Sequence, residues 1–134
     1  MHASYLDVLG TALVAFRHGP PSELMPEANR TVLQGTVDLL ILKTLSWGPR
    51  HGYAIARWIE ETTDDVLRIE EGSLYPALYR MQKRGWIKSG WGESDIGKPI
   101  RIYSLTPAGR AELRAQSVQW DTMVKAMARV LKPA

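Results

Sequence analysis

The chain has 134 residues, of which 45% are hydrophobic and 23% charged, a balance typical of one small globular domain with an added arm. Its net charge of +3 is compatible with a polyanionic partner. The absence of cysteine excludes disulfides, thiolate metal sites and cysteine catalysis, and it agrees with a location in the reducing cytoplasm.

Residues 1–30 are predicted to form an N-terminal arm and linker. Residues 5–16 are apolar, but they are too few to span a bilayer and lack the basic start of a signal peptide. The Gly-Pro-Pro at 19–21 ends any helix, and residues 22–30 are expected to be a linker. The arm is either loosely held, or packed on a dimer partner, or an artefact of a true translation start at Met25.

Residues 31–106 are predicted to form the body of the domain. A helix is expected from Thr36 to Trp47, because apolar residues recur from Val37 at the spacing of one helix face. Leu39 and Leu42 lie off this face, so the helix is apolar on two sides. The second side requires a partner, which is either the arm or another subunit.

A second helix is expected from His51 to about Thr62. Its predicted core face consists of Gly52, Ile55, Ala56 and Ile59. His51 either caps this helix or lies at the surface, or it touches a phosphate at the helix N-terminus. The acidic connection that follows lacks the ligand spacing of a calcium loop and is expected to be solvated.

The stretch from Glu71 to Ile87 contains the third predicted helix. Its inward face is formed by Leu74, Leu78 and Met81. Within it, Ser73 is expected to be the N-cap, Pro76 to lie in the first turn and Gly85 to end the helix.

The other face of this third helix carries aromatic rings, an amide and cations, but no carboxylate. The side chains expected to point outward are Tyr75, Tyr79, Arg80, Gln82 and Lys83. This combination suits a helix that enters a DNA groove. The alternative is an ordinary surface helix with solvated charges.

Two strands are predicted after this helix, at 87–91 and 100–105, joined by a loop too long for a tight hairpin. Three helices followed by a two-stranded hairpin predict a mainly α (α+β) winged helix–turn–helix. In that design the third helix reads the major groove and the wing contacts the DNA backbone. Lys98 and Arg101 in the wing are suited to phosphates or to a minor groove.

Residues 107–134 are predicted to form a long C-terminal helix. It is expected to start at Pro107 behind the N-cap Thr106 and to run to Leu131. A heptad seam follows one side, formed by Leu113, Ser117, Trp120, Val124, Met127 and Leu131. Because a small body leaves this helix little to pack on, we predict that it forms a homodimer. The alternative is a helix folded back on its own core.

Trp120 on this seam has two interpretations. It is either part of an ordinary core, or it lines a cavity for flat aromatic compounds at the dimer interface together with Leu39 and Leu42.

Four segments in order resemble the PadR family of bacterial transcriptional regulators: LQGTVDLLIL at 33–42, HGYAI at 51–55, GSLYPAL at 72–78 and YSLTPAG at 103–109. The resemblance covers about residues 31–131. It implies a winged helix with a C-terminal dimerisation helix. Most family members are repressors that bind palindromic operators as dimers, and some are released by phenolic acids or by planar drugs.

The resemblance also implies particular site residues. The implied DNA contacts are Ser73, Tyr75, Pro76, Arg80, Lys98, Arg101 and Tyr103. In the drug-binding branch a tryptophan of the last helix faces its mate across a central pore, and Trp120 stands at that place, beside Leu39 and Leu42. The wing departs from the family pattern, because Ile100 and Ile102 replace one cation and one tyrosine.

The sequence therefore predicts a dimeric repressor of a neighbouring transporter, efflux or metabolic gene, released by a small aromatic effector at the dimer interface. It needs no cofactor and no metal and has no membrane contact. The alternative is a winged-helix protein-interaction module without sequence-specific DNA binding. An enzyme is disfavoured because no nucleophile–base pair and no metal cluster is evident.

Overall fold

The computed structural model describes the backbone of residues 27–132 and the side chains of residues 35–132. The expected apolar helix at 5–16, the break at 19–21 and the alternative start at Met25 lie outside the described residues. The elements, in chain order, are α2 (Glu27–Leu45), β1 (Arg50–His51), α3 (Gly52–Thr62), α4 (Glu71–Lys83), β2 (Ile87–Glu93), β3 (Pro99–Leu105) and α5 (Pro107–Leu131).

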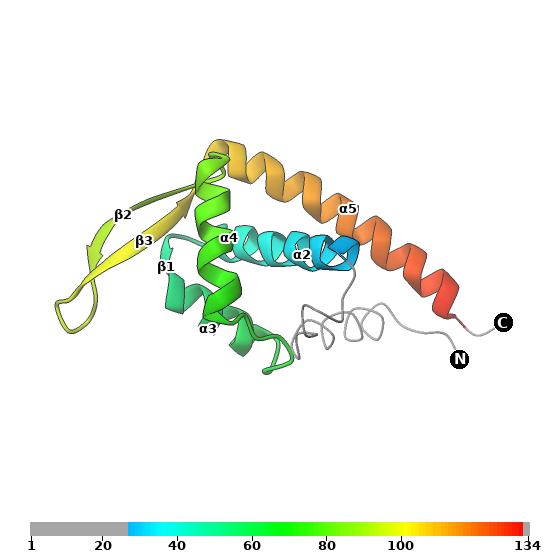
Figure 1. Cartoon of the computed structure of the whole chain (residues 1–134), viewed down its shortest axis with the longest axis horizontal. Coiled ribbons are helices and arrows are strands. Elements are labelled where there is room, and N and C mark those ends of the chain that lie inside the picture. Colours follow the sequence, from blue (N-terminus) through cyan, green and yellow to red (C-terminus); the bar gives the residue numbers. More distant parts are fainter. Residues whose placement is uncertain (1–26, 133–134) are drawn as a thin grey trace.

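The fold is the predicted mainly helical winged helix with a small antiparallel sheet and a long last helix. In Figure 1, α4 crosses α2, while the hairpin of β2 and β3 extends away from the helices as a wing. α5 contacts α2 along the other side of the domain. The fully buried core side chains come from every helix, from the connection between α3 and α4, and from the base of the wing: Ile41, Leu42, Leu45, Ile55, Ile59, Leu67, Leu74, Leu78, Met81, Ile87 and Val124.

Helix α2 begins at Glu27, so the prediction of a linker is wrong for residues 27–30. These four residues contain neither glycine nor proline, and three of them are good helix formers, so nothing in them stops the helix. The predicted inward face is confirmed, with Val37, Ile41 and Leu45 buried. Leu42 is also completely buried in the core of its own chain. The prediction that it lies at an interface is therefore wrong.

The predicted start of the third helix is also corrected. α4 begins at Glu71, and the N-cap is Glu70, whose side chain makes no capping bond. The carbonyl of Glu70 already accepts hydrogen bonds from the amides of Ser73 and Leu74, both at 2.9 Å, so Ser73 lies inside the first turn. Pro76 consequently falls in the second turn rather than in the first.

The predicted end of this helix is confirmed at Gly85, which has a φ of +77°. Its amide donates to the carbonyl of Gln82 at 3.0 Å, and the amide of Trp86 donates to the carbonyl of Met81 at 3.1 Å. This pair of bonds is the Schellman motif, which requires a left-handed residue that glycine adopts without strain.

The sheet has three strands in the order β1-β3-β2, rather than the two that were predicted. The additional strand pairs Arg50 with Tyr103 and His51 with Ile102. A strand of two residues is too short to show an alternating pattern, which explains why the sequence did not reveal it. β2 also continues to Glu93, two residues beyond its predicted end.

Helix α5 is attached to the backbone at the end of α4 through Thr106 and Gly109. Thr106 is its N-cap, as predicted, and accepts the amide of Gly109 at 3.0 Å. The amide of Thr106 donates to the carbonyl of Trp86 at 3.1 Å, and its hydroxyl donates to the carbonyl of Gly85 at 2.6 Å. A Cβ on Gly109 would lie 2.0 Å from the Trp86 carbonyl oxygen, so only glycine allows this approach.

Two residues of the predicted seam on α5 pack inside the chain, while Ser117 between them is exposed. Leu113 packs against the core cluster and Val124 is buried, so the expectation that α5 has little of its own domain to pack on is wrong. Met127 and Leu131, at the end of the seam, remain exposed. Figure 1 shows this last part of α5 extending beyond the start of α2.

Candidate nucleic-acid interface

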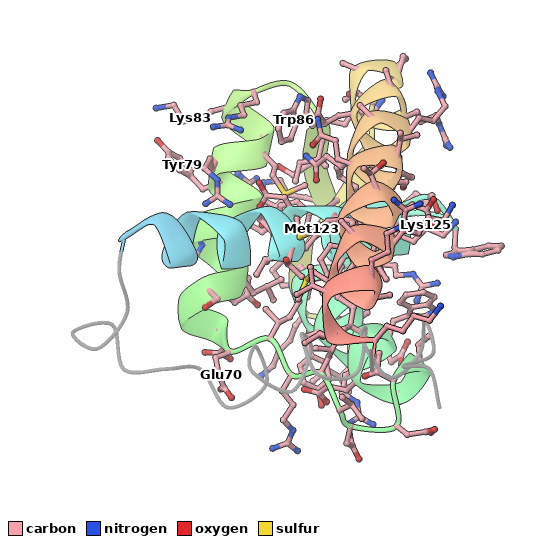
Figure 2. All side chains as sticks on the ribbon, turned by 90° about the vertical axis from the view of Figure 1, so that its right-hand side faces the viewer. Glu70, Tyr79, Lys83, Trp86, Met123 and Lys125 are labelled. Carbon is pink, nitrogen blue, oxygen red and sulfur yellow. The ribbon has the colours of Figure 1, made fainter. Side chains whose placement is uncertain are left out.

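The outward face of α4 is a continuous exposed surface. It consists of Ser73, Tyr75, Pro76, Tyr79, Gln82 and Lys83. The ammonium of Lys83 lies 5.3 Å from the centre of the Tyr79 ring, and both side chains project from α4 on the side away from α5 (Figure 2). The face therefore offers a cation, aromatic rings and an amide together, as the sequence predicted.

Charge changes sign along α4. Glu70 and Glu71 are exposed at its first turn, and Lys83 lies in its last turn. Figure 2 shows Glu70 at the opposite end of the helix from Tyr79 and Lys83. The two carboxylates suit a helix N-terminus, but they repel phosphates. A polyanion is therefore attracted to the middle and the end of α4.

The prediction that Arg80 points outward is wrong. Its guanidinium donates a hydrogen bond to the carboxylate of Asp38 on α2, and the two side chains form an ion pair. Asp38 is buried, and burial raises the pKa of its carboxyl, although the charge of Arg80 and the hydrogen bond from it act in the opposite direction. Arg80 thus ties α4 to α2 and is occupied within the chain.

The start of α3 borders the face of α4. A Cβ on Gly52 would lie 2.9 Å from the ring of Tyr75, so a residue without a side chain allows α3 and α4 to approach closely here. His51 is the N-cap of α3, and its Nδ1 accepts the amide of Ala54 at 3.3 Å. The exposed ring of Tyr53 stacks parallel to the His51 ring, with 6.3 Å between their centres.

The wing borders α4 on its other side. Ser89 of β2 donates to the side-chain oxygen of Gln82 at 3.2 Å. Lys98 is exposed where the wing loop meets β3, and Arg101 is exposed on that strand with its guanidinium 4.9 Å from the centre of the Trp91 ring.

Tyr103 lies at the base of the wing and packs against the core. It is only partly exposed, and burial raises the pKa of its hydroxyl, with Arg101 acting in the opposite direction and Tyr75 adding to the rise. Tyr103 therefore stays protonated at neutral pH, close to both the core and the exposed face of α4.

A pocket of about 360 Å³ lies between α2, α5 and the end of α4. Leu39, Trp120 and Met123 line its apolar part, and Asp38, Arg80, Arg84 and Glu112 line its charged part. The pocket thus contains two of the three residues predicted to border an effector cavity, since Leu42 lies in the core. It is formed within one chain.

Sequence reasoning did not assign two exposed aromatic residues near this interface, Tyr53 and Trp91. Tyr53 had a signal, because it falls off the predicted core face of its helix. Trp91 had none. Alternation from the buried Ile87 places it on the inward face, yet its side chain is exposed.

Other kinds of site find no support in the described part of the chain. Among residues 27–132, no cluster of three or more histidine, aspartate or glutamate side chains is arranged to hold a metal ion. Over the same residues, no helix combines the length and the apolar composition that a membrane span needs.

Comparison with known proteins identifies relatives of this arrangement. Residues 41–115 match the Transcriptional regulator PadR-like family. A transcriptional regulator from Clostridium thermocellum is similar in structure, with a TM-score of 0.70 and 34% identity over 76% of this chain and 99% of that one. A PadR family transcription regulator from Clostridium difficile has a TM-score of 0.62 and 31% identity, over 71% and 97% of the two chains. The transcriptional regulator Rv3488 of Mycobacterium tuberculosis is 39% identical over 57 residues, which are 42% of this chain and 52% of the relative.

Proposed function

Because this chain belongs to the PadR-like family of DNA-binding transcriptional regulators, we propose that it acts in the cytoplasm as a homodimeric repressor of a neighbouring transporter, efflux or metabolic gene. Family membership makes it a regulator rather than an enzyme. Its target is double-stranded DNA with two inverted half-sites.

The observation that carries the proposal is the exposed face of α4, bordered by α3 and by the wing. Tyr75 meets the start of α3, and Gln82 is bonded to Ser89 of the wing, so the three elements form one surface. In our proposal α4 enters a major groove, with Ser73, Tyr75, Pro76, Tyr79 and Lys83 toward the DNA. The start of α3, Lys98 and Arg101 contact the flanking backbone or groove.

The dimer is proposed to form through the exposed end of α5. Met127 and Leu131 continue the seam beyond the part that packs in the chain, and Met123 and Val130 add exposed apolar area beside them. A second copy would bury this apolar surface. Two reading helices would then be placed in successive major grooves, roughly 34–36 Å apart.

The pocket beside Trp120 is the proposed effector site. The indole of Trp120 and the side chains of Leu39 and Met123 suit a flat aromatic compound. Because the pocket lies between α2 and α5, the bound compound would contact the proposed dimerisation helix. The effector releases the DNA if it binds more tightly to the arrangement of α5 that separates the two reading helices incorrectly.

Fluorescence anisotropy tests the proposed function. The protein is titrated into labelled DNA from upstream of its own gene and into a scrambled duplex, each at two salt concentrations. We expect tight binding to the upstream DNA alone, which weakens as the salt concentration rises. Equal weak binding to both duplexes would contradict sequence-specific regulation. No binding at low salt would favour the alternative, a winged-helix module that binds other proteins.

A further inference from the structure

The indole of Trp91 does not pack in the core of the domain. It is 72% exposed on β2, one of the two strands of the wing that extends away from the helices (Figure 1). Its direct partner across the hairpin is Arg101, whose guanidinium lies over its ring at 4.9 Å. The ring is not part of the core cluster, so its contact with Arg101 is its main interaction in the described chain.

The pair lies on the side of the wing that faces α4. Residues directly opposite in an antiparallel pair share a face, as do residues two positions further along. On this face of the hairpin, the pair that precedes Trp91 and Arg101 is Ser89 and Tyr103, two positions away on each strand. Ser89 is bonded to Gln82 of α4. A duplex bound to α4 is therefore flanked by the Trp91–Arg101 pair.

At the tip of the wing, Lys98 is the one side chain that attracts a phosphate backbone. Glu93 and Asp95 are exposed there, against the single cation Lys98, so the tip is net negative. The neighbouring Ile96, 77% exposed, offers no charge at all. On the face of the wing that carries Trp91, attraction to DNA is therefore concentrated behind the tip, at Arg101.

We propose that Trp91 is a positioning residue: its ring holds the guanidinium of Arg101 for entry into an A·T-rich minor groove beside the major groove occupied by α4. Narrow A·T-rich minor grooves have an enhanced negative potential that attracts arginine. A stacked guanidinium loses less conformational freedom on binding. This inference rests on the proposed function and adds a feature of the DNA target, a short A·T tract flanking each half-site.

The experiment uses the full chain and the upstream DNA segment that it protects. In a second duplex, 2,6-diaminopurine replaces each adenine of the flanking A·T pairs, which adds an amino group in the minor groove and leaves the major-groove edge unchanged. We expect the wild-type Kd to rise on the modified duplex. Trp91→Ala should raise the Kd on unmodified DNA roughly two- to fivefold, as expected for loss of an exposed cation–π contact, and should be less sensitive to the modification. Trp91→Phe should retain most of both properties.

Two further variants separate positioning from direct contact. If Trp91 acts through Arg101, adding Trp91→Ala to Arg101→Ala should leave the Kd unchanged, whereas independent DNA contacts would give additive losses and overturn the inference. Ile96→Ala, on the same wing, should bind like the wild type. A loss with Ile96→Ala but not with Trp91→Ala would assign the contact to the tip and also overturn it. Wild-type protein that binds neither duplex would instead refute the proposed function.

Discussion

Asp38 is a carboxylate that the fold buries against one arginine. It lies beside the inward face of α2, and Arg80 lies next to the buried Met81 at the edge of the inward face of α4. An edge position is ambiguous in a helical pattern, because a long side chain there reaches either solvent or the neighbouring helix. That ambiguity explains why Arg80 was predicted as a DNA contact.

The raised pKa of Asp38 predicts a particular dependence of stability on pH. Above the ordinary value of 3.8, the folded chain retains a proton on Asp38 that the unfolded chain has lost. The free energy of unfolding therefore falls as pH rises from 3.8 to the pKa of the folded state. Asp38→Asn removes this dependence. Urea unfolding of both proteins across this range should show the wild type losing stability relative to the variant, and parallel pH profiles would contradict the prediction.

The Gly109 contact predicts a large effect of one methyl group. Gly109→Ala places a Cβ against the Trp86 carbonyl and should lower the free energy of unfolding by about 2–3 kcal/mol through overpacking. Gly72→Ala is the matched control, since Gly72 is also helical but has open space around it. It should leave stability unchanged or raise it by up to about 1 kcal/mol. Denaturant unfolding measures both, and equal values for the two variants would show that α5 is not held close to Trp86.

At the scale of the element, α4 separates two tasks between neighbouring cations. Arg80 is paired inside the domain, whereas Lys83 is exposed beside Tyr79. The helix is thus fixed to α2 by one cation and presents the other to a partner. Its acidic first turn directs that partner to its C-terminal part.

This division predicts opposite results for two alanine variants. Lys83→Ala should weaken DNA binding on specific and scrambled duplexes alike and lower the slope of affinity against salt by about 1, with stability unchanged. Arg80→Ala should lower the free energy of unfolding by about 1–3 kcal/mol, because it leaves the buried Asp38 without its partner. Anisotropy at several salt concentrations and urea unfolding give both values. An altered salt slope for Arg80→Ala with full stability would restore Arg80 to the DNA contacts.

Elements with a regular apolar period were predicted well from the sequence. The inward faces of α2, α3 and α4 and the end of α4 at Gly85 follow from side-chain spacing and from the demands of a left-handed residue. The start of α4 was missed because Glu70 caps it through its backbone, and β1 was missed because two residues have no pattern. The pocket was only partly predicted, because helical spacing alone did not show that Leu42 faces the core of its own chain.

At the scale of the whole molecule, one part of α5 packs on the domain and its end is exposed to solvent. Leu113 packs on the core, and the end of the helix carries exposed apolar side chains. The proposed dimer therefore joins two preformed domains rather than two unfolded chains.

The dimer prediction is tested at the end of this helix. A Met127→Asp/Leu131→Asp double variant should be monomeric at micromolar protein concentration, because two charges replace apolar surface that the partner would cover. Val118→Asp is the matched control, since Val118 is also apolar and exposed but lies on the opposite side of α5 by the helical period. It should remain dimeric. Light scattering measures both, and a wild-type monomer would refute the proposal.

The joint between Trp86 and Gly109 makes α5 a lever arm for α4. Its 25 residues span roughly 37 Å, so tilting the helix by about 5° about the joint moves its far end by about 3 Å. Hydrogen bonds from the amide and the hydroxyl of Thr106, and a contact that admits only glycine, hold this joint closely. A small rotation between the α5 helices of the two subunits would therefore rotate their α4 helices by nearly the same angle. In evolution, the proposed dimer would then change its half-site spacing most easily by substitutions at the far end of α5, distant from the residues proposed to contact DNA.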